Sequence, residues 1–164
     1  MSPSWLPGLV CLSSYGGNAE IYIQALYFIF KEDFIISRPV FRGRQIGLAR
    51  YDLQDGKCVT FWHIIQERPI GAQERPDLRR CEKIRWPKPI IENCEDRLIK
   101  IWEEYSRKDN CLLLYLEEKE YVVVLSIRKN YYLLKTAYPV TYQKKKQQLL
   151  KNYMEYRKKL APSS

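Results

Sequence analysis

The sequence predicts an α+β fold, in which N-terminal helices pack on a mainly antiparallel sheet of about four strands and a basic helix follows at the C-terminus. Three observations favour this fold. Helical patterns come first in the chain, three strand-like runs follow at residues 111–116, 121–127 and 131–138, and only short polar turns separate these runs. Such short links favour antiparallel neighbours, because a parallel pair needs a crossover of about a dozen residues.

Length and composition indicate one domain. The chain has 164 residues, of which 46% are hydrophobic and 13% aromatic, and this balance excludes disordered and collagen-like proteins. We assign residues 18–142 to a single α+β domain, residues 1–17 to a flexible arm rich in Ser, Pro and Gly, and residues 143–164 to a basic C-terminal helix or tail.

The first half of the domain carries one helical pattern and one hairpin pattern. Asn18 is a good N-cap for a helix that extends to about residue 30, although this run also alternates partly like a strand. Residues 45–53 and 57–65 are predicted as two strands, and Asp55-Gly56 between them is a strong signal for a tight hairpin turn.

The middle and the end of the chain favour helices around the three strands. Residues 77–84 suit a short helix with Pro76 at its start, and residues 87–95 suit a second helix. Residues 98–104 fit a helix or a strand. The pattern of residues 141–160 predicts a final helix. Four apolar or aromatic residues lie roughly on one side of it: Leu149, Leu150, Tyr153 and Tyr156.

The charge balance points to a polyanionic partner. The chain has 28 basic and 19 acidic side chains, a net charge of +9, so nucleic acid is the first candidate and an anionic membrane the second. The final helix concentrates this charge, with seven cations against Glu155. We select Lys144, Lys145 and Lys146 as candidate RNA contacts, and a solvated basic face is the other interpretation.

Neither a metal site nor a membrane segment is expected. The five cysteines are widely spaced and form no CxxC pair, and His63 is the only histidine, so we expect free thiols and no metal ion or cofactor. The longest apolar run is far shorter than the roughly 18–20 residues that span a bilayer, and the N-terminus lacks the basic start of a signal peptide. These features predict a cytoplasmic protein with no membrane contact.

His63 is the first candidate for chemistry. It lies in the apolar run 61–65, its side chain titrates near neutral pH, and Glu67 four residues later could share its face. The two side chains could accept and return a proton. The simpler interpretation is a strand histidine that is satisfied by one hydrogen bond.

A basic cluster follows between residues 75 and 85. Its cations repel one another at helical spacings of three or four residues, and a bound phosphate would relieve this repulsion. Neutralisation by Asp77 and Glu82 on a solvated face is the alternative. The candidate phosphate ligands of this cluster are Arg79, Arg80, Lys83 and Arg85.

The strand-like run 131–138 places Tyr132, Thr136 and Tyr138 on one face. The hydroxyls of Thr136 and Tyr138 could donate to a phosphoryl oxygen, and a tyrosine ring could stack on a base. Packing in the core is an equal alternative for Tyr132.

Several stretches of the chain form an ordered set. They are Phe61-Trp62-His63-Ile64-Ile65, Arg79-Arg80-Cys81-Glu82-Lys83-Ile84-Arg85-Trp86 with Pro89-Ile90-Ile91, Tyr121-Val122-Val123-Val124-Leu125, and Tyr131-Tyr132-Leu133-Leu134-Lys135-Thr136-Ala137-Tyr138. Over about residues 45–142 this set resembles the phage- and mobile-element-encoded nucleases of the barnase–EndoU–colicin–RelE (BECR) superfamily. The resemblance implies a helical N-terminal part on a four-stranded antiparallel sheet, and metal-independent cleavage of RNA, typically in toxins or conflict systems.

The resemblance also implies roles for individual residues. His63 would transfer a proton, Arg79, Arg80 and Lys83 would hold the phosphate, and Thr136 and Tyr138 would supply hydroxyls at the site. Because the chain has one histidine, a mechanism with two histidines is excluded. The second proton-transfer group would have to be Glu67, Lys83 or a tyrosine.

The combined expectation is a metal-independent endoribonuclease of toxin or phage-conflict type. It would cleave RNA, such as tRNA or mRNA, by attack of the RNA 2′-hydroxyl, with a cognate antitoxin or immunity protein as a candidate partner. The alternatives are a non-catalytic RNA-binding module on the same fold and a protein that sequesters a nuclease or a defence factor.

Overall fold

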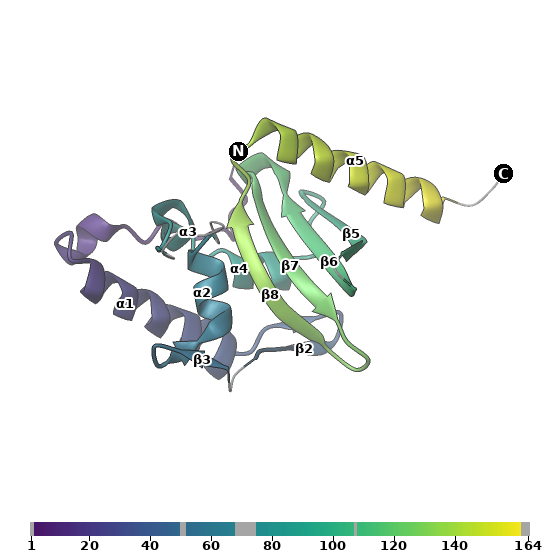
Figure 1. The fold of residues 1–164 in the computed structure, drawn as a ribbon. Coiled ribbons are helices and arrows are strands. Elements are labelled where there is room, and N and C mark those ends of the chain that lie inside the picture. The colour runs from purple at the N-terminus through teal and green to yellow at the C-terminus, as the bar shows by residue number, and fades with distance from the viewer. Residues whose placement is uncertain (1, 50–51, 68–74, 107, 162–164) are drawn as a thin grey trace.

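The computed structural model describes residues 2–49, 52–67, 75–106 and 108–161, and it shows a six-stranded sheet with helices on both faces (Figure 1). The strand order is β1-β2-β8-β7-β6-β5. The strands are β1 (Val40–Phe41), β2 (Arg44–Gly47), β5 (Ile99–Ser106), β6 (Asp109–Leu116), β7 (Tyr121–Ile127) and β8 (Tyr132–Pro139). A separate hairpin consists of β3 (Leu53–Gln54) and β4 (Lys57–Cys58).

The helices divide between the two sides of the sheet. Those of the described residues are α1 (Ala19–Lys31), α2 (Val59–Ile65), α3 (Leu78–Glu82), α4 (Pro87–Glu92) and α5 (Gln143–Leu160). Short helical turns occur at Leu12–Tyr15, Glu32–Ile36 and Glu117–Lys119. In Figure 1 the helices α1 to α4 lie together on one side, and α5 crosses the other side near the C-terminal end of β8.

The sheet separates two apolar cores, and alternating residues of its central strands serve one core each. In β6, Leu112 and Leu114 belong to the larger core under α1 to α4, whereas Leu113 and Tyr115 belong to the smaller core under α5. Leu149 of α5 is buried in the smaller core. Because both faces of this strand are covered, its sequence is continuously apolar instead of alternating.

The predicted α+β class is confirmed, but the sheet differs from the predicted one of about four antiparallel strands. Strands β5 to β8 form an antiparallel meander, which β2 and β1 extend beyond β8. The β2–β8 pair is parallel, with Ile46 opposite Tyr132 and Gly47 opposite Leu133, so the sheet is mixed. With two and four residues, β1 and β2 are too short to show a reliable alternation of polar and apolar residues.

The predicted turn at Asp55-Gly56 is confirmed, but the strand predicted at residues 57–65 is wrong. Both turn residues have positive φ, 51° and 76°, as a tight two-residue hairpin requires. Strand β4 ends at Cys58 and helix α2 follows at once, because the buried residues of this run lie on one helical face: Thr60, Phe61, Ile64 and Ile65. The predicted strand 45–53 is only partly present, and its residues 50 and 51 lie outside the described residues.

The remaining helices lie where the sequence predicted them, with shifted ends. The Asn18 side chain caps α1 by accepting from the Ile21 amide at 3.0 Å. Asp77 is the N-cap of α3, and α4 ends at Glu92, three residues before the predicted end. The run that fitted a helix or a strand forms most of β5.

The N-terminal segment, which we expected to be a flexible arm, makes specific contacts with the domain. The Trp86 indole donates to the Pro7 carbonyl at 3.0 Å, and the Trp5 indole donates to the Asp96 carboxylate at 2.8 Å. Val10 is buried, and its carbonyl accepts from the Tyr22 hydroxyl at 2.6 Å. These contacts join the segment to α1 and to the region around α4.

Candidate functional site

A pocket of about 340 Å³ lies where α3, the end of β8 and the start of α5 meet. We call it the Arg79 pocket. It brings together five residues that the sequence predicted for the site, namely Glu67, Arg79, Arg80, Tyr138 and Lys145, together with Asp77 and Tyr142. These side chains come from four separate parts of the chain, and they supply carboxylates, cations and aromatic rings to one concave surface.

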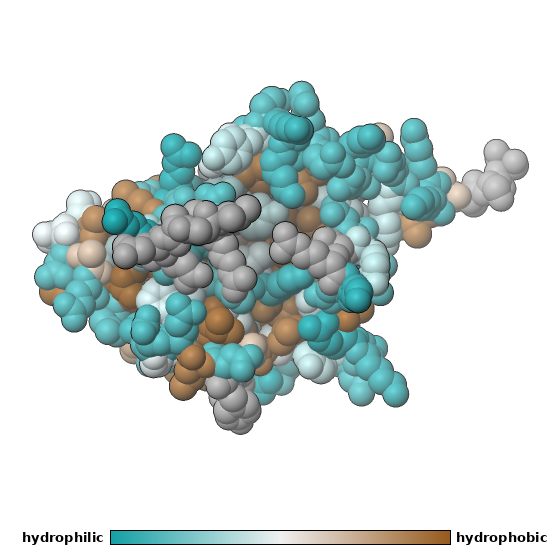
Figure 2. All heavy atoms as spheres, in the orientation of Figure 1, coloured by the Kyte–Doolittle hydropathy of each residue, from teal (hydrophilic) through white to brown (hydrophobic). Residues whose placement is uncertain are grey.

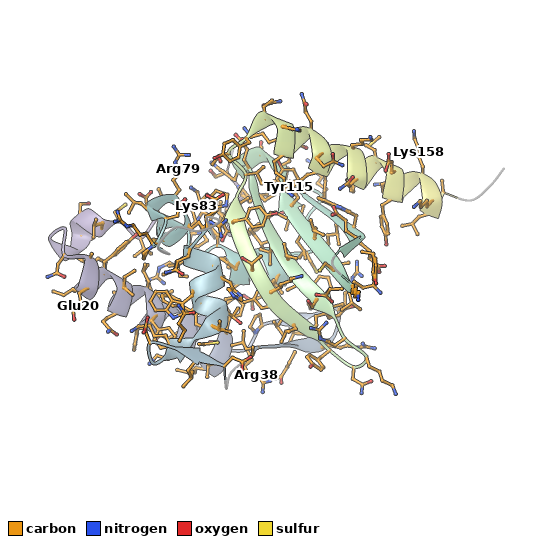
Figure 3. All side chains as sticks on the ribbon, in the orientation of Figure 1. Glu20, Arg38, Arg79, Lys83, Tyr115 and Lys158 are labelled. Atoms are coloured by element: carbon orange, nitrogen blue, oxygen red, sulfur yellow. The ribbon has the colours of Figure 1, made fainter. Side chains whose placement is uncertain are left out.

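Asp77 fixes the start of α3 and thereby the position of Arg79. Its carboxylate accepts hydrogen bonds from the Arg79 amide at 2.8 Å and from the Arg80 amide at 3.3 Å. The Asp77 amide in turn donates to the carbonyl of Ile65, the last residue of α2, at 2.7 Å. The Arg79 side chain is exposed, and it is labelled on α3 in Figure 3.

Arg80 holds the end of α2. Its Nη1 atom donates to the main-chain oxygens of His63 at 3.2 Å and Gln66 at 3.0 Å. A cation is favourable at this position, because the last carbonyls of a helix have no partner within the helix and carry partial negative charge. The guanidinium also lies over the Tyr138 ring, 5.3 Å from its centroid. Arg80 therefore positions a wall of the pocket, and among the described residues its other guanidinium N–H groups donate no hydrogen bond.

His63 lies on a helix, and its side chain is not among the pocket-lining residues of the described chain. Its main-chain oxygen nevertheless accepts two hydrogen bonds, one from Arg80 and one, at 2.7 Å, from the Thr136 hydroxyl. The motif stretches that contain His63, Arg80 and Thr136 are thus joined at this carbonyl. Helix α2 ends at Ile65 and Gln66 is extended, so Glu67 does not follow His63 by one turn of the same helix.

The Thr136 hydroxyl uses its proton on the His63 carbonyl, so it is not a free donor for a phosphate. Thr136 lines an adjacent pocket of about 250 Å³, which shares Tyr138 and Lys145 with the Arg79 pocket. The two pockets therefore meet along the end of β8.

Three further predicted site residues do not line the Arg79 pocket. The Lys83 ammonium lies 5.4 Å from the centroid of the Trp86 ring. Arg85 is exposed near Asp33, whose pKa is raised by burial to about 6, with Lys88 and then Arg85 opposing that rise. Tyr132 is half-buried and packs edge-on against Phe41 at 5.0 Å, which agrees with the core-packing alternative.

The three selected lysines of α5 have different surroundings. Lys145 lines the Arg79 pocket, Lys144 is exposed, and Lys146 forms an ion pair with Glu120. The described part of the chain supplies no ion-pair partner for Lys145 or for Arg79. These two cations are therefore available to an anion in the pocket. Figure 2 shows hydrophilic side chains over the outer side of α5.

Sequence reasoning missed Tyr142, which lines the pocket with 69% of its surface exposed. It is the N-cap residue of α5. A signal was present in the sequence, because Tyr142 lies two residues before the lysine run 144–146, and single-strand-binding grooves combine cations with aromatic rings on which bases stack.

Among the described residues, no group of three or more His, Cys, Asp or Glu side chains is arranged to hold a metal ion. None of the described helices combines the length and the hydropathy needed to cross a bilayer. The five cysteines are unpaired, and Cys58, Cys81 and Cys111 are buried.

No protein-family model, curated protein or solved structure matches this chain. The likeness to the BECR superfamily therefore rests on the motif residues alone.

Proposed function

We propose that the protein is a metal-independent endoribonuclease that binds an RNA phosphate in the Arg79 pocket. The observation that carries this proposal is the grouping of Glu67, Arg79, Tyr138 and Lys145 around one pocket. RNA cleavage at its own 2′-hydroxyl needs a base, an acid and positive charge on the phosphate, and this pocket contains residue types for all three. The proposal includes a toxin or phage-conflict role, with tRNA or mRNA as substrate.

Glu67 is the general base in this proposal. Its carboxylate takes the proton of the 2′-hydroxyl, whose oxygen then forms a bond to phosphorus. The bond from phosphorus to the 5′-oxygen breaks, and the Tyr138 hydroxyl gives a proton to this leaving oxygen. The products are a 2′,3′-cyclic phosphate and a 5′-hydroxyl. Glu67 replaces His63 as the proton acceptor, because His63 does not line the pocket.

Arg79 and Lys145 stabilise the negative charge that builds up on the phosphate oxygens. Both side chains are exposed, so they can reach a phosphate without breaking an internal contact. Arg80 holds the pocket wall through its bonds to His63 and Gln66. Preorganised cations of this kind contribute a few kcal/mol to the stabilisation of a transition state, on the order of 10²–10³ in rate per donor.

The test is incubation of the purified protein with total RNA in EDTA, followed by sequencing of the new 5′ ends. We expect 5′-hydroxyl ends, and we expect Glu67→Gln to lower the cleavage rate by about a hundredfold or more with RNA affinity retained. Glu20→Gln is the matched control, since Glu20 lies on α1, away from the pocket (Figure 3). Cleavage at the parent rate by Glu67→Gln would assign the base elsewhere, and activity only with added magnesium would contradict the metal-free mechanism.

A second candidate function is RNA binding without cleavage. Thr136 and one Arg80 nitrogen already donate hydrogen bonds to main-chain carbonyls. Because these donors are occupied, fewer donors remain to stabilise a transition state, and this favours binding without cleavage. A non-catalytic protein would shift RNA in a gel without shortening it.

A further inference from the structure

A second basic pocket, of about 490 Å³, lies at the opposite end of β8 from the Arg79 pocket. We call it the Arg44 pocket. It is lined by Arg38, Arg44, Gln45, Gly47, Asn130 and Tyr131, together with Leu48. The residues come from the segment before β1, from β2 and from the β7–β8 turn. None of these lining residues is acidic.

Arg38 and Arg44 make this pocket suitable for an anion. No acidic side chain of the described residues forms an ion pair with either arginine. Two guanidinium groups at one concave surface repel each other, and a phosphate that accepts hydrogen bonds from both relieves this repulsion. Gln45 and Asn130 add amide groups that can donate to the same ligand or to a base. Arg38 is labelled near the lower end of the sheet in Figure 3.

The Tyr131 ring supplies an aromatic surface whose position is fixed by the neighbouring strand. A Cβ atom built on Gly47 would lie 2.9 Å from Cδ2 and 3.0 Å from Cε2 of this ring. The ring therefore lies directly against the backbone of β2, at a position where only glycine leaves room for it. Tyr131 is 44% exposed, so part of the ring remains accessible to a base. Stacking of a base on an aromatic ring is tolerant of sequence.

We infer that the Arg44 pocket binds one nucleotide of single-stranded RNA, with its phosphate between Arg38 and Arg44 and its base stacked on Tyr131. This inference rests on the proposed function only in taking RNA as the ligand. Tyr131 precedes Tyr138 by seven positions along the chain, which corresponds to about 23 Å on a strand. Single-strand-binding folds cover roughly 4–16 nucleotides, so one RNA strand can occupy both pockets.

The test compares a fluorescent trinucleotide with an RNA of about 12 nucleotides, by anisotropy at fixed ionic strength in EDTA. Tyr131→Ala is expected to weaken binding of the longer RNA about tenfold and to affect the trinucleotide less, because a trinucleotide can bind in the Arg79 pocket alone. Tyr131→Phe should retain the parent affinity, because the ring remains. Tyr105→Ala is the matched control, since Tyr105 is 70% exposed on the edge strand β5.

Two further variants separate loss of the pocket from loss of the fold. Gly47→Ala should weaken binding of the longer RNA as Tyr131→Ala does, because the added methyl group displaces the ring. Arg44→Gln changes an exposed side chain and should weaken the same binding without lowering the melting temperature.

The outcomes distinguish this inference from the proposed function. Parent-like binding of the longer RNA by both Tyr131→Ala and Arg44→Gln overturns the inference, whatever the cleavage assay shows. If the parent protein never cleaves RNA but Tyr131→Ala and Arg44→Gln still weaken binding of the longer RNA, the proposed function fails while the Arg44 pocket stands. Failure of the parent protein to bind either RNA overturns both.

Discussion

The hydroxyl of Thr136 donates a hydrogen bond of 2.7 Å to the main-chain oxygen of His63, which precedes it by 73 residues. Arg80 donates to the same oxygen at 3.2 Å. One carbonyl at the end of α2 therefore connects a helix, a following short helix and a strand of the sheet. This connection forms the wall behind the Arg79 pocket.

Thr136→Val should lower the free energy of unfolding by about 1–2 kcal/mol, because it removes a hydrogen bond to a carbonyl at a helix end. Urea denaturation measures this loss. Thr136→Ser keeps the hydroxyl and should restore most of the stability. Equal stability of the valine and parent proteins would mean that Arg80 alone satisfies the His63 oxygen.

Arg79→Ala should lower both RNA affinity and cleavage rate, because the guanidinium contacts the phosphate in the ground state and in the transition state alike. We expect a loss of about tenfold to a hundredfold in kcat/KM. Steady-state kinetics with a short fluorogenic RNA gives the two parameters separately. Arg97→Ala is the control, since Arg97 is also exposed but does not line the pocket.

Lys145→Gln should flatten the salt dependence of RNA binding. One lost phosphate contact on a single strand lowers the slope of log K against log salt by about 0.7. Lys158→Gln should leave the slope unchanged, because Lys158 is at the far end of α5 and points away from the sheet (Figure 3). Equal slopes for the two variants would remove Lys145 from the binding site. Deletion of α5 is a poorer test, since it would expose the core that Leu149 fills.

Asp109 should make stability fall in acid. A hydrogen bond from Ser126, followed by bonds from Lys135 and Arg128, lowers the pKa of Asp109 from 3.8 to about 2. Because the folded-state pKa is depressed, this stabilisation is present above pH 4 and is lost as the pH falls toward 2. Urea denaturation across this range should show a decline in the parent protein that is smaller in Asp109→Asn. Parallel curves would contradict the assignment.

Much of the fold could be predicted from residues whose chemistry is local. Asn18 caps a helix because its side chain is short and polar, and Asp55-Gly56 turns the chain because both residues tolerate positive φ. The run 57–65 could not be assigned from the sequence alone, since a short apolar run fits a strand and a buried helix equally well. Most of this run forms helix α2 because its apolar face packs against the rest of the core.

The residue types of the candidate site could be predicted from the sequence, but the positions of their side chains in the structure were harder to predict. Glu67, Arg79, Tyr138 and Lys145 were selected for their chemistry, and they line one pocket. The direction of the His63 side chain was not predictable, because it depends on whether α2 is a helix and where this helix ends.

The parallel pairing of β2 with β8 also bears on how the chain folds. The meander from β5 to β8 is built from neighbouring segments, whereas Ile46 must find Tyr132 from the other half of the chain. Contacts between distant segments cost more loop-closure entropy and form later than local hairpins. During synthesis the apolar side chains of α1 and α2, such as Phe30 and Phe61, precede the strands that cover them. The N-terminal half therefore depends on the last strand of the sheet for its native state, and a ribosome that stalls before β8 leaves these aromatic surfaces open to chaperones and aggregation.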